Sequence, residues 1–290
     1  MTLITRLSAA FTDTSLPRLF SDPVWNEAGG RMLFDSKNTI CHPTQSETLT
    51  QSTLLRSAGE NNWPISVDSA FNPLAYNSAT GRITVPGGPG TMIVEDSGDA
   101  NTGSFTLINN ASHDYAVSFW IYVPSTPWTQ QSQAFFSKGS GNTSSSHSLV
   151  VAFNGTNPVI KIGRPKSTDT GWFNNTLQTA SLAAGVYRLG ISWRKVSGTW
   201  RRYGIIGEST PLSGNDSADT FGTDANGIQL PGVGSTWNAR LFGTIGFGYP
   251  SINAGGMGIY RFYMENLTQS GRTAEQVWDA DWARGNGRFS

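Results

Sequence analysis

Acidic side chains are the first candidates for chemistry in this sequence. A pair of carboxylates can hydrolyse a glycosidic bond when both face one cleft, about 5–9.5 Å apart. The densest acidic group is Glu95, Asp96 and Asp99, which follows an apolar run and reads as the end of a strand entering a turn. Such a position does not favour a shared cleft. We therefore predict no catalytic residue, and a polysaccharide depolymerase that uses Glu95 or Asp96 stays an alternative.

Metal chemistry has one candidate segment, the oxygen-rich stretch that contains Asp216, Asp219, Asp224 and Asn226. Hard cations favour oxygen ligands of this kind. The spacing matches no calcium loop, however, and Asp, Asn and Gly are also the residues that form ordinary turns. With one cysteine and three histidines, the chain also lacks the usual ligands of a zinc site. The sequence predicts no metal and no cofactor, and leaves open whether this loop holds an ion.

Cys41 and His42 are neighbours in a polar stretch before Pro43. A nucleophile and its base usually come from positions that are distant in the sequence and adjacent in space. We interpret this pair as bystanders. The sequence also contains neither a G-x-S-x-G elbow nor a G-x-x-x-x-G-K-[ST] phosphate loop.

Basic residues cluster in two pairs, Arg194-Lys195 and Arg201-Arg202, on either side of a predicted turn. This arrangement favours a solvated hairpin over a nucleic-acid surface. The whole chain has 20 Lys and Arg against 20 Asp and Glu, so it lacks the excess positive charge that phosphate binding requires. We expect no nucleic-acid partner.

Aromatic residues are the chemical excess of this chain, with 10 Trp among its 290 residues. Four of them fall in predicted loops: Trp128, Trp172, Trp237 and Tyr249. An exposed aromatic ring can stack on the apolar face of a sugar or anchor a protein interface. We predict these four as ligand-binding residues; the alternative is that each ring packs beneath its own loop.

Composition limits the elements that could position these residues. Charged residues make up 14% of the chain, against about 25% in a typical domain, so long Lys- and Glu-rich helices are not expected. No apolar run reaches the roughly 20 residues that span a bilayer. The opening run from Leu3 to Phe11 is broken by Arg6 and does not fit a signal peptide. We expect no membrane insertion.

From Arg82 onward, short apolar runs alternate with Gly- and Asn-containing turns, which predicts an antiparallel sandwich. Residues 187, 189, 191 and 193 alternate with residues 188, 190, 192 and 194, as in a strand with two distinct faces. The predicted strands are Arg82–Val85, Thr91–Glu95, Ser104–Ile108, Tyr115–Val123, Ala134–Lys138, Ser148–Phe153, Val159–Gly163, Val186–Lys195, Thr199–Gly207, Leu241–Phe247 and Gly258–Glu265.

One helix is predicted near the end of the sequence. Thr273 and Gln276 match a capping box, and Val277, Trp278 and Trp282 form an apolar stripe. Gly285 is expected just past this helix.

The first 60 residues read as an extended or helical arm and connector, followed by a sandwich over residues 61–290. Apolar residues at positions 3, 7, 10 and 11 fit one face of a short helix. The large apolar groups of this part either pack against the main domain or bind another subunit. The residues predicted to bind a partner are Leu3, Leu7, Phe11, Phe20 and Trp25. Deleting residues 1–35 is expected to leave a folded sandwich.

Three blocks of the sequence together resemble the concanavalin-A-like (laminin-G-like) jelly-roll family. They are Tyr115–Val123 with Ala134–Gly139, then Ala184–Trp193, then Gly256–Thr268. The resemblance implies an all-β, antiparallel jelly-roll sandwich with one short C-terminal helix. Its catalytic members carry a Glu-x-Asp-x-Glu pattern on one strand, and this chain departs from them there.

The opening segment Leu3–Pro17 and the ending from Tyr260 through Arg272 to Trp282 resemble bacteriophage virion structural proteins. An apolar arm, low charge, no disulfide framework and no export signal fit the same class. This resemblance implies a non-enzymatic tail-fibre or baseplate component, made in the host cytoplasm and released by lysis. The arm would bind other virion proteins, and the sandwich would bind a host-surface glycan as a homo-oligomer, with a trimer favoured. The alternative is a capsid or tail decoration protein that binds no glycan.

Overall fold

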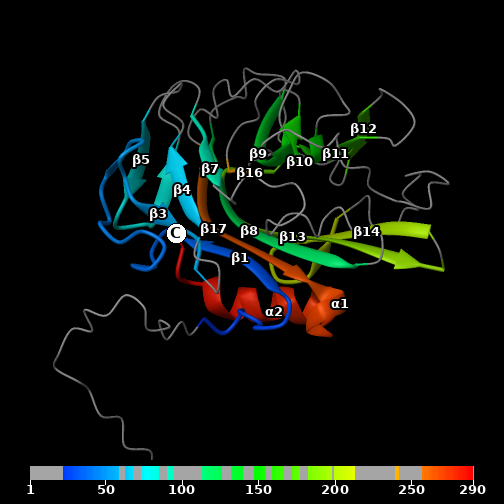
Figure 1. Ribbon diagram of the computed structural model, residues 1–290. Helices are drawn as coiled ribbons and strands as arrows, with labels where there is room; N and C mark the ends of the chain where they lie inside the picture. Colours follow the sequence, from blue (N-terminus) through cyan, green and yellow to red (C-terminus); the bar gives the residue numbers. More distant parts are fainter. Residues whose placement is uncertain are drawn as a thin grey trace, which may run out of the picture.

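The computed structural model describes residues 22–58, 63–67, 73–84, 90–94, 113–125, 132–139, 147–154, 159–165, 172–176, 182–197, 199–212, 239–241 and 257–289. These residues form two antiparallel sheets that face each other, with two helices on the outer side of one sheet (Figure 1). The short helix predicted from Leu3 to Phe11 and the strand predicted at Ser104–Ile108 lie outside this part of the chain.

The nine-stranded sheet, called here the covered sheet, follows the order β15-β14-β13-β8-β17-β6-β5-β2, with β1 paired to β17. Its central strands β8 and β17 pair along nearly their whole length, from Tyr115 opposite Asn266 to Tyr122 opposite Gly258. Its strands are β1 (Gly30–Asp35), β2 (Thr48–Leu49), β5 (Leu74–Asn77), β6 (Arg82–Thr84), β8 (Tyr115–Val123), β13 (Gly185–Val196), β14 (Thr199–Ile206), β15 (Thr210–Pro211) and β17 (Gly258–Asn266).

The eight-stranded sheet, called here the second sheet, follows the order β12-β11-β10-β9-β16-β7-β4-β3. Its strands are β3 (Leu55–Arg56), β4 (Pro64–Val67), β7 (Met92–Val94), β9 (Ser132–Gly139), β10 (His147–Asn154), β11 (Val159–Pro165), β12 (Trp172–Thr176) and β16 (Ala239–Leu241). Of the strand predicted at Leu241–Phe247, only Leu241 falls within the described residues. The antiparallel sandwich predicted from the sequence is confirmed.

The main hydrophobic core collects buried side chains from both sheets, including Leu189 and Ile191 of β13. Phe119 of β8 and Phe262 of β17 pack with their ring centroids 5.0 Å apart. Phe34 of β1 lies opposite Phe262 in the register and is also fully buried. The leading part of the chain therefore supplies core residues directly.

Helix α2 (Ala274–Gly285) begins with the predicted capping box, in which the side chains of Thr273 and Gln276 each accept a backbone hydrogen bond. It follows the single-turn helix α1 (Leu267–Ser270). Gly285 is the last residue of α2 rather than the residue after it, and the left-handed backbone conformation occurs at Gly287.

Helix α2 lies on the outer face of the covered sheet. The indole Nε1 of Trp278 donates to the carbonyl of Val117 in β8 at 3.1 Å. A Cβ added at Gly190 in β13 would lie 2.7 Å from the Trp278 ring, so this glycine permits the close approach of helix and sheet. Because the helix covers this face, both faces of β13 are buried around Gly190, and Arg188 and Ser192 are buried as well.

Residues 22–58 are built into the sandwich and supply β1, β2 and β3. Val24, Met32, Leu33 and Phe34 are fully buried in the main core, so for these residues packing against the main domain is the correct alternative. The structure gives a physical reason to expect that a chain without residues 1–35 would be destabilised. That deletion removes β1, which pairs with β17 inside the covered sheet.

Neither helix among the described residues has the length and apolar character needed to cross a membrane.

Candidate functional site

Most of the side chains predicted from the sequence to bind ligands or partners lie outside the described residues. Trp172 does not lie in a loop, as predicted, but is the first residue of β12, opposite Pro165, on an edge strand of the second sheet. The predicted residues outside the described part are Trp128, Trp237, Tyr249, Leu3, Leu7, Phe11 and Phe20. The acidic groups at 95–99 and 216–226 lie outside it too.

The strand register relates the chain segments that carry the predicted loop aromatics. β12 begins where β11 ends, and β16 begins opposite Lys138, near the end of β9. β10 starts opposite Gly139, so these points lie at one end of the second sheet. In the sequence, Trp237 comes two residues before β16, whereas Trp128 precedes β9 and Tyr249 follows β16. Of the four aromatics, only Trp172 has a described position, at this end of the second sheet.

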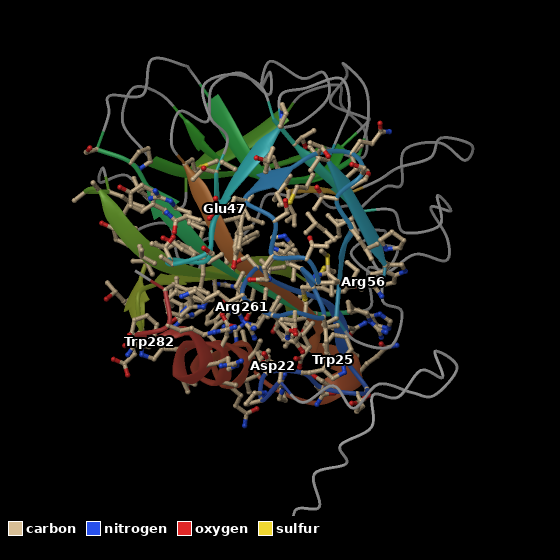
Figure 2. The ribbon with its side chains drawn as sticks, turned by 90° about the vertical axis from the view of Figure 1, so that its left-hand side faces the viewer. Asp22, Trp25, Glu47, Arg56, Arg261 and Trp282 are labelled. Atoms are coloured by element: carbon tan, nitrogen blue, oxygen red, sulfur yellow. The ribbon has the colours of Figure 1, made fainter. Side chains whose placement is uncertain are left out.

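Trp25 is the one predicted partner-binding residue that the structure describes. Its ring meets the ring of Tyr263 edge-on, with a centroid separation of 6.2 Å, and it packs against the main core. Figure 2 shows Trp25, Asp22, Arg261 and Trp282 beside α2, on the same side of the molecule. The predicted contact of Trp25 with another subunit stays a prediction.

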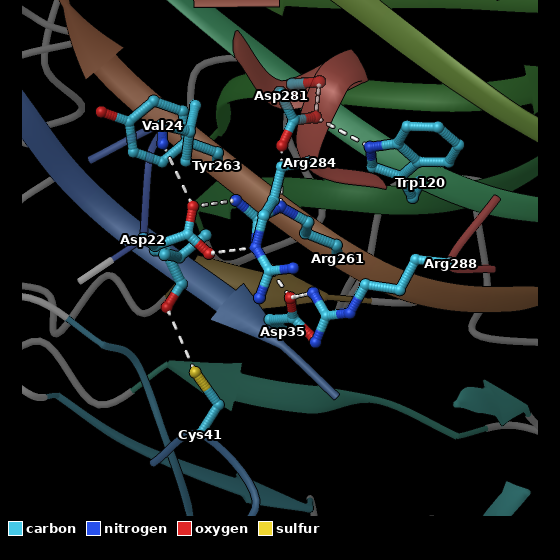
Figure 3. A network of polar contacts seen from close by, with 12 residues as sticks. Asp22, Val24, Asp35, Cys41, Trp120, Arg261, Tyr263, Asp281, Arg284 and Arg288 are labelled. Atoms are coloured by element: carbon cyan, nitrogen blue, oxygen red, sulfur yellow. Dashed lines mark hydrogen bonds and ion pairs between the residues drawn. The ribbon is translucent and has the colours of Figure 1, made fainter. Parts of the chain in front are cut away.

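A buried cluster of charges centred on Arg261 of β17 is the densest polar arrangement among the described residues (Figure 3). Its Nε donates to Asp281 of α2 at 2.7 Å, and its Nη1 donates to Asp35 of β1 at 2.8 Å. Asp22 accepts from Nη1 at 3.0 Å and from Nη2 at 2.8 Å, a two-pronged contact. Arg261, Asp35 and Asp281 have no exposed surface, and Asp22 is 6% exposed. Buried charges need such partners because desolvation is otherwise very costly.

Two more arginines balance the three carboxylates of this cluster. Arg284 donates to Asp22 at 3.3 Å, and Arg288 forms an ion pair with Asp35. The Arg261 cluster, defined as these three arginines with Asp22, Asp35 and Asp281, is thus neutral in total. Asp281 also accepts hydrogen bonds from the side chains of Ser118 and Trp120 in β8.

The pKa values of Asp22 and Arg261 are both shifted toward the charged form of the group. Burial alone would raise the pKa of Asp22, but hydrogen bonding to Arg261 and its positive charge outweigh burial, and the pKa lies below its ordinary value. Burial alone would lower the pKa of Arg261, but the negative charges of Asp281, Asp22 and Asp35 raise it. These carboxylates are therefore ion-paired hydrogen-bond acceptors and not acids that face solvent.

A second cluster, formed by Glu265, Tyr263 and Arg272, contacts the backbone of Val24, two residues after Asp22. Glu265 of β17 is fully buried and accepts from the hydroxyl of Tyr263 at 2.6 Å and from Nε of Arg272 at 2.9 Å. Nη2 of Arg272 donates to the backbone carbonyl of Val24 at 2.6 Å. Residues 22–24 are consequently held on one side by Arg261 and on the other by Arg272. We call this region, residues 22–25 against 261–288, the terminal junction.

Cys41 and His42, two further candidates for chemistry in the sequence, are inaccessible. Burial raises the pKa of the Cys41 thiol to about 12, and its Sγ points at the carbonyl of Leu33 at 3.7 Å. His42 is fully buried against the Tyr76 ring, and burial lowers its pKa. A thiol that stays protonated is a poor nucleophile. The geometry fits the interpretation of this pair as bystanders.

Among the described residues, no group of three or more His, Cys, Asp or Glu side chains could hold a metal ion. The Arg261 cluster could not be found from the sequence, because members that are in contact are far apart along the chain, Asp22 and Arg284 by 262 positions. One local signal was available. Arg261 is a charged residue within the strand Gly258–Asn266, whose other members are largely apolar, and such a residue needs buried partners.

Comparison with known proteins gives the fold. No family model and no curated protein matches the sequence. The structure is similar to one of botulinum neurotoxin type C, whose cell entry is described as dependent upon interaction with two ganglioside molecules (10% identity, TM-score 0.52, 82% of this chain and 50% of that one). It is also similar to the binding domain of botulinum neurotoxin DC in complex with SialylT (11%, 0.50, 81% and 50%).

A third similar structure is Trypanosoma rangeli sialidase, at 8% identity and a TM-score of 0.53, covering 90% of this chain and 34% of the sialidase. The chain thus spans about half the length of the neurotoxin chains and a third of the sialidase chain. At these identities the likeness defines a fold: a two-sheet antiparallel sandwich found in receptor-binding domains and also in a sialidase.

Proposed function

We propose that this protein is a non-enzymatic binding module of a bacteriophage virion, associated with a tail fibre or baseplate, whose sandwich recognises a glycan on the host surface. The observation that carries the proposal is the sandwich shared over four-fifths of the chain with receptor-binding domains, one described with gangliosides and one with SialylT.

The terminal junction supports the attachment part of the proposal. Asp22 and Val24 are held by Arg261 and Arg272, so the chain that precedes Asp22 starts from a point fixed on β17 and α2. The segment available for attachment to other virion proteins is then residues 1–21, with Leu3, Leu7, Phe11 and Phe20 as its large apolar groups. Trp25 would lie at the base of this contact.

Two truncations test the attachment role. Removing residues 1–20 leaves Asp22 and β1 in place, so the protein should fold normally and fail to join particles. Removing residues 1–35 should destabilise the sandwich, because β1 and both junction contacts are lost. If the protein that lacks residues 1–20 is incorporated into particles at the normal level, the attachment role of this segment is rejected.

A glycan array probed with the full chain tests recognition, and electron microscopy of labelled particles tests location. Binding to a defined set of glycans, with label on the tail, supports the proposal. Label on the capsid, together with no binding to any glycan on the array, identifies a decoration protein. Release of reducing ends from host polysaccharide, lost on changing Glu95 or Asp96, identifies a depolymerase and rejects a non-enzymatic role.

A further inference from the structure

Helix α2 covers only part of the outer face of the covered sheet. It ends at Gly285, where an added Cβ would overlap the ring of Trp120 in β8. Side chains alternate between the two faces of a strand, so Tyr122, two residues further along β8, shares this outer face and lies beyond the end of the helix. Tyr122 is partly exposed. The outer face therefore reaches solvent at this end of β8.

A cluster of mostly aromatic side chains, separate from the main core, underlies this end of the face. Three members are buried and three are partly exposed; in that order they are Trp120, Tyr260, Phe289, Tyr122, Val186 and Trp282. The rings of Trp120 and Trp282 stack at a centroid distance of 5.4 Å and an angle of 18°. Val186 of β13 lies directly opposite Tyr122 in the register. We call the three partly exposed residues, together with Arg82 and Arg188, the outer patch.

Arg82 of β6 reaches this cluster across a neighbouring strand. Between β6 and β8 runs β17, in which Gly258 pairs with Thr84 on one side and with Tyr122 on the other. A Cβ at Gly258 would lie 2.5 Å from the Arg82 side chain, so the glycine leaves the space that this side chain crosses. The guanidinium carbon then lies 4.1 Å from the centroid of the Tyr122 ring.

The positive charge of Arg82 is not neutralised by a carboxylate. Its side chain hydrogen-bonds the hydroxyl of Tyr260, which is a neutral partner. Among the described residues, its Nε has no hydrogen-bond partner and no ion pair joins it to an acid. Arg82 is also partly exposed, so its guanidinium can accept an anion from solution.

Arg188 of β13 carries a second positive charge, beneath the cluster. It is fully buried opposite Trp120 in the register, and its guanidinium carbon lies 5.7 Å from the centroid of the Trp282 ring. Nη2 donates to the backbone carbonyl of Glu208. Nε and Nη1 find no hydrogen-bond partner in the part of the chain that the structure describes.

The protein balances the charge of Arg188 only in part. Burial lowers its pKa to about 10, although the negative charges of Asp281, Asp279 and Glu208 act in the opposite direction. Asp281 is engaged by Arg261, and the other two acids are exposed, where water and salt screen them. A buried charge without a counter-ion is costly, and an anion bound nearby reduces this cost because charges interact over several ångströms where water is excluded.

We infer that the outer patch binds an acidic saccharide, meaning a glycan that bears a carboxylate. Arg82 donates to the carboxylate, since a guanidinium offers it two parallel N–H groups. Arg188 favours the anion from beneath without touching it, and the exposed parts of Trp282 and Val186 contact the apolar face of a sugar ring.

Charge complementarity selects this occupant. Two arginines without carboxylate partners lie beside partly exposed apolar side chains, and an acidic sugar combines one anionic group with an apolar ring face. Nucleic acid requires a broader positive surface than a chain with equal numbers of basic and acidic residues provides. The inference rests on the proposed glycan recognition, and it names the class of glycan and its place in the fold.

The test titrates the full chain, by calorimetry, with two matched pairs of saccharides: trigalacturonate with its methyl ester, and sialyllactose with lactose. At least one acidic member should bind more tightly than its neutral partner, and its affinity should fall as salt rises from about 50 mM to about 500 mM. R82Q should weaken this binding about tenfold or more, the loss expected for a charge-assisted hydrogen bond. R82K should keep an intermediate affinity, because lysine retains the charge and loses the paired N–H groups.

Two further variants separate the outer patch from a general effect of charge. R188M removes the buried charge and should weaken binding about threefold or more. R56Q is the matched control, because Arg56 of β3 in the second sheet also has an Nε without a hydrogen-bond partner among the described residues. Figure 2 shows Arg56 and Trp282 on opposite sides of the molecule. R56Q should bind like the unmodified chain, and thermal unfolding shows that each variant is folded.

The outcomes distinguish this inference from the proposed function. Equal affinity of R82Q and R56Q for the acidic saccharide overturns the outer patch, and unchanged affinity of R188M overturns the role of its buried charge. If neither acidic saccharide binds, the inference is rejected, and the proposed function stands only when the glycan array is positive. No saccharide binding in either assay rejects both. Tighter binding to a DNA oligonucleotide or to phosphatidylglycerol vesicles rejects the saccharide class.

Discussion

Replacing Arg261 by methionine tests whether the terminal junction is essential to the fold. The substitution keeps an unbranched side chain of similar length and removes the guanidinium. It leaves Asp22 with Arg284, Asp35 with Arg288, and Asp281 with the neutral donors of β8 alone. Three buried carboxylates would then share two partly exposed arginines.

The size of the effect follows from the contacts that are lost. Arg261 donates four hydrogen bonds to three carboxylates, at 2.7 to 3.0 Å, with no exposed surface of its own. Removing one partner of a buried ion pair typically costs about 3–5 kcal/mol. Since whole domains are stable by about 5–15 kcal/mol, R261M should lose a large part of its free energy of unfolding.

Urea unfolding followed by tryptophan fluorescence measures this loss directly. Arg284→Met is the matched control, because that side chain is 33% exposed and makes one contact at 3.3 Å, so it should cost less than about 1 kcal/mol. R261M/D281N should cost less than the sum of the single changes, since the two residues share a contact. A loss below about 1 kcal/mol for R261M, or strict additivity, would refute the reasoning.

Three further outcomes are expected. Gly190→Ala should destabilise the protein by about 1–3 kcal/mol in thermal unfolding, because its Cβ would lie 2.7 Å from Trp278; an unchanged melting temperature would contradict this. Cys41 should resist Ellman's reagent at pH 8 and react after unfolding in urea, since burial raises its pKa to about 12; rapid reaction of the native chain would argue against burial. The pKa of Asp22 is lower in the folded than in the unfolded protein, so its ion pairs stabilise the fold above the unfolded pKa, and this stabilisation is lost as the pH falls through the folded pKa. D22N should therefore make the free energy of unfolding less dependent on pH in the acid range. An unchanged dependence would count against the ion pair.

The strands and the final helix could be predicted because their signals are local. Tyr115–Val123 forms a strand with the predicted bounds, and the capping box at Thr273 starts α2 where expected. Alternation along β13 is also present, since Leu189 and Ile191 enter the main core while Gly190 meets Trp278. Periodicity and capping depend only on residues a few positions apart, so one sequence is enough to find them.

The terminal junction could not be predicted, because its contacts join residues that are far apart in the sequence. Asp22 and Arg261 are 239 positions apart, and nothing near Asp22 indicates that it will be buried. Alternation in β13 shows that two faces exist, but not that a distant helix covers one of them. The same limitation kept residues 30–56 assigned to an arm, although they provide three strands of the sandwich.

The position of Asp22 has a mechanical consequence. Tension applied to the chain ahead of this residue reaches the two-pronged ion pair with Arg261 before it reaches β1. Arg261 in turn belongs to a strand that is hydrogen-bonded to β8 on one side and to β1 and β6 on the other, so the load spreads across the covered sheet instead of peeling its edge. In the proposed attachment role, a pull on the leading segment would therefore load β17, inside the covered sheet, before β1.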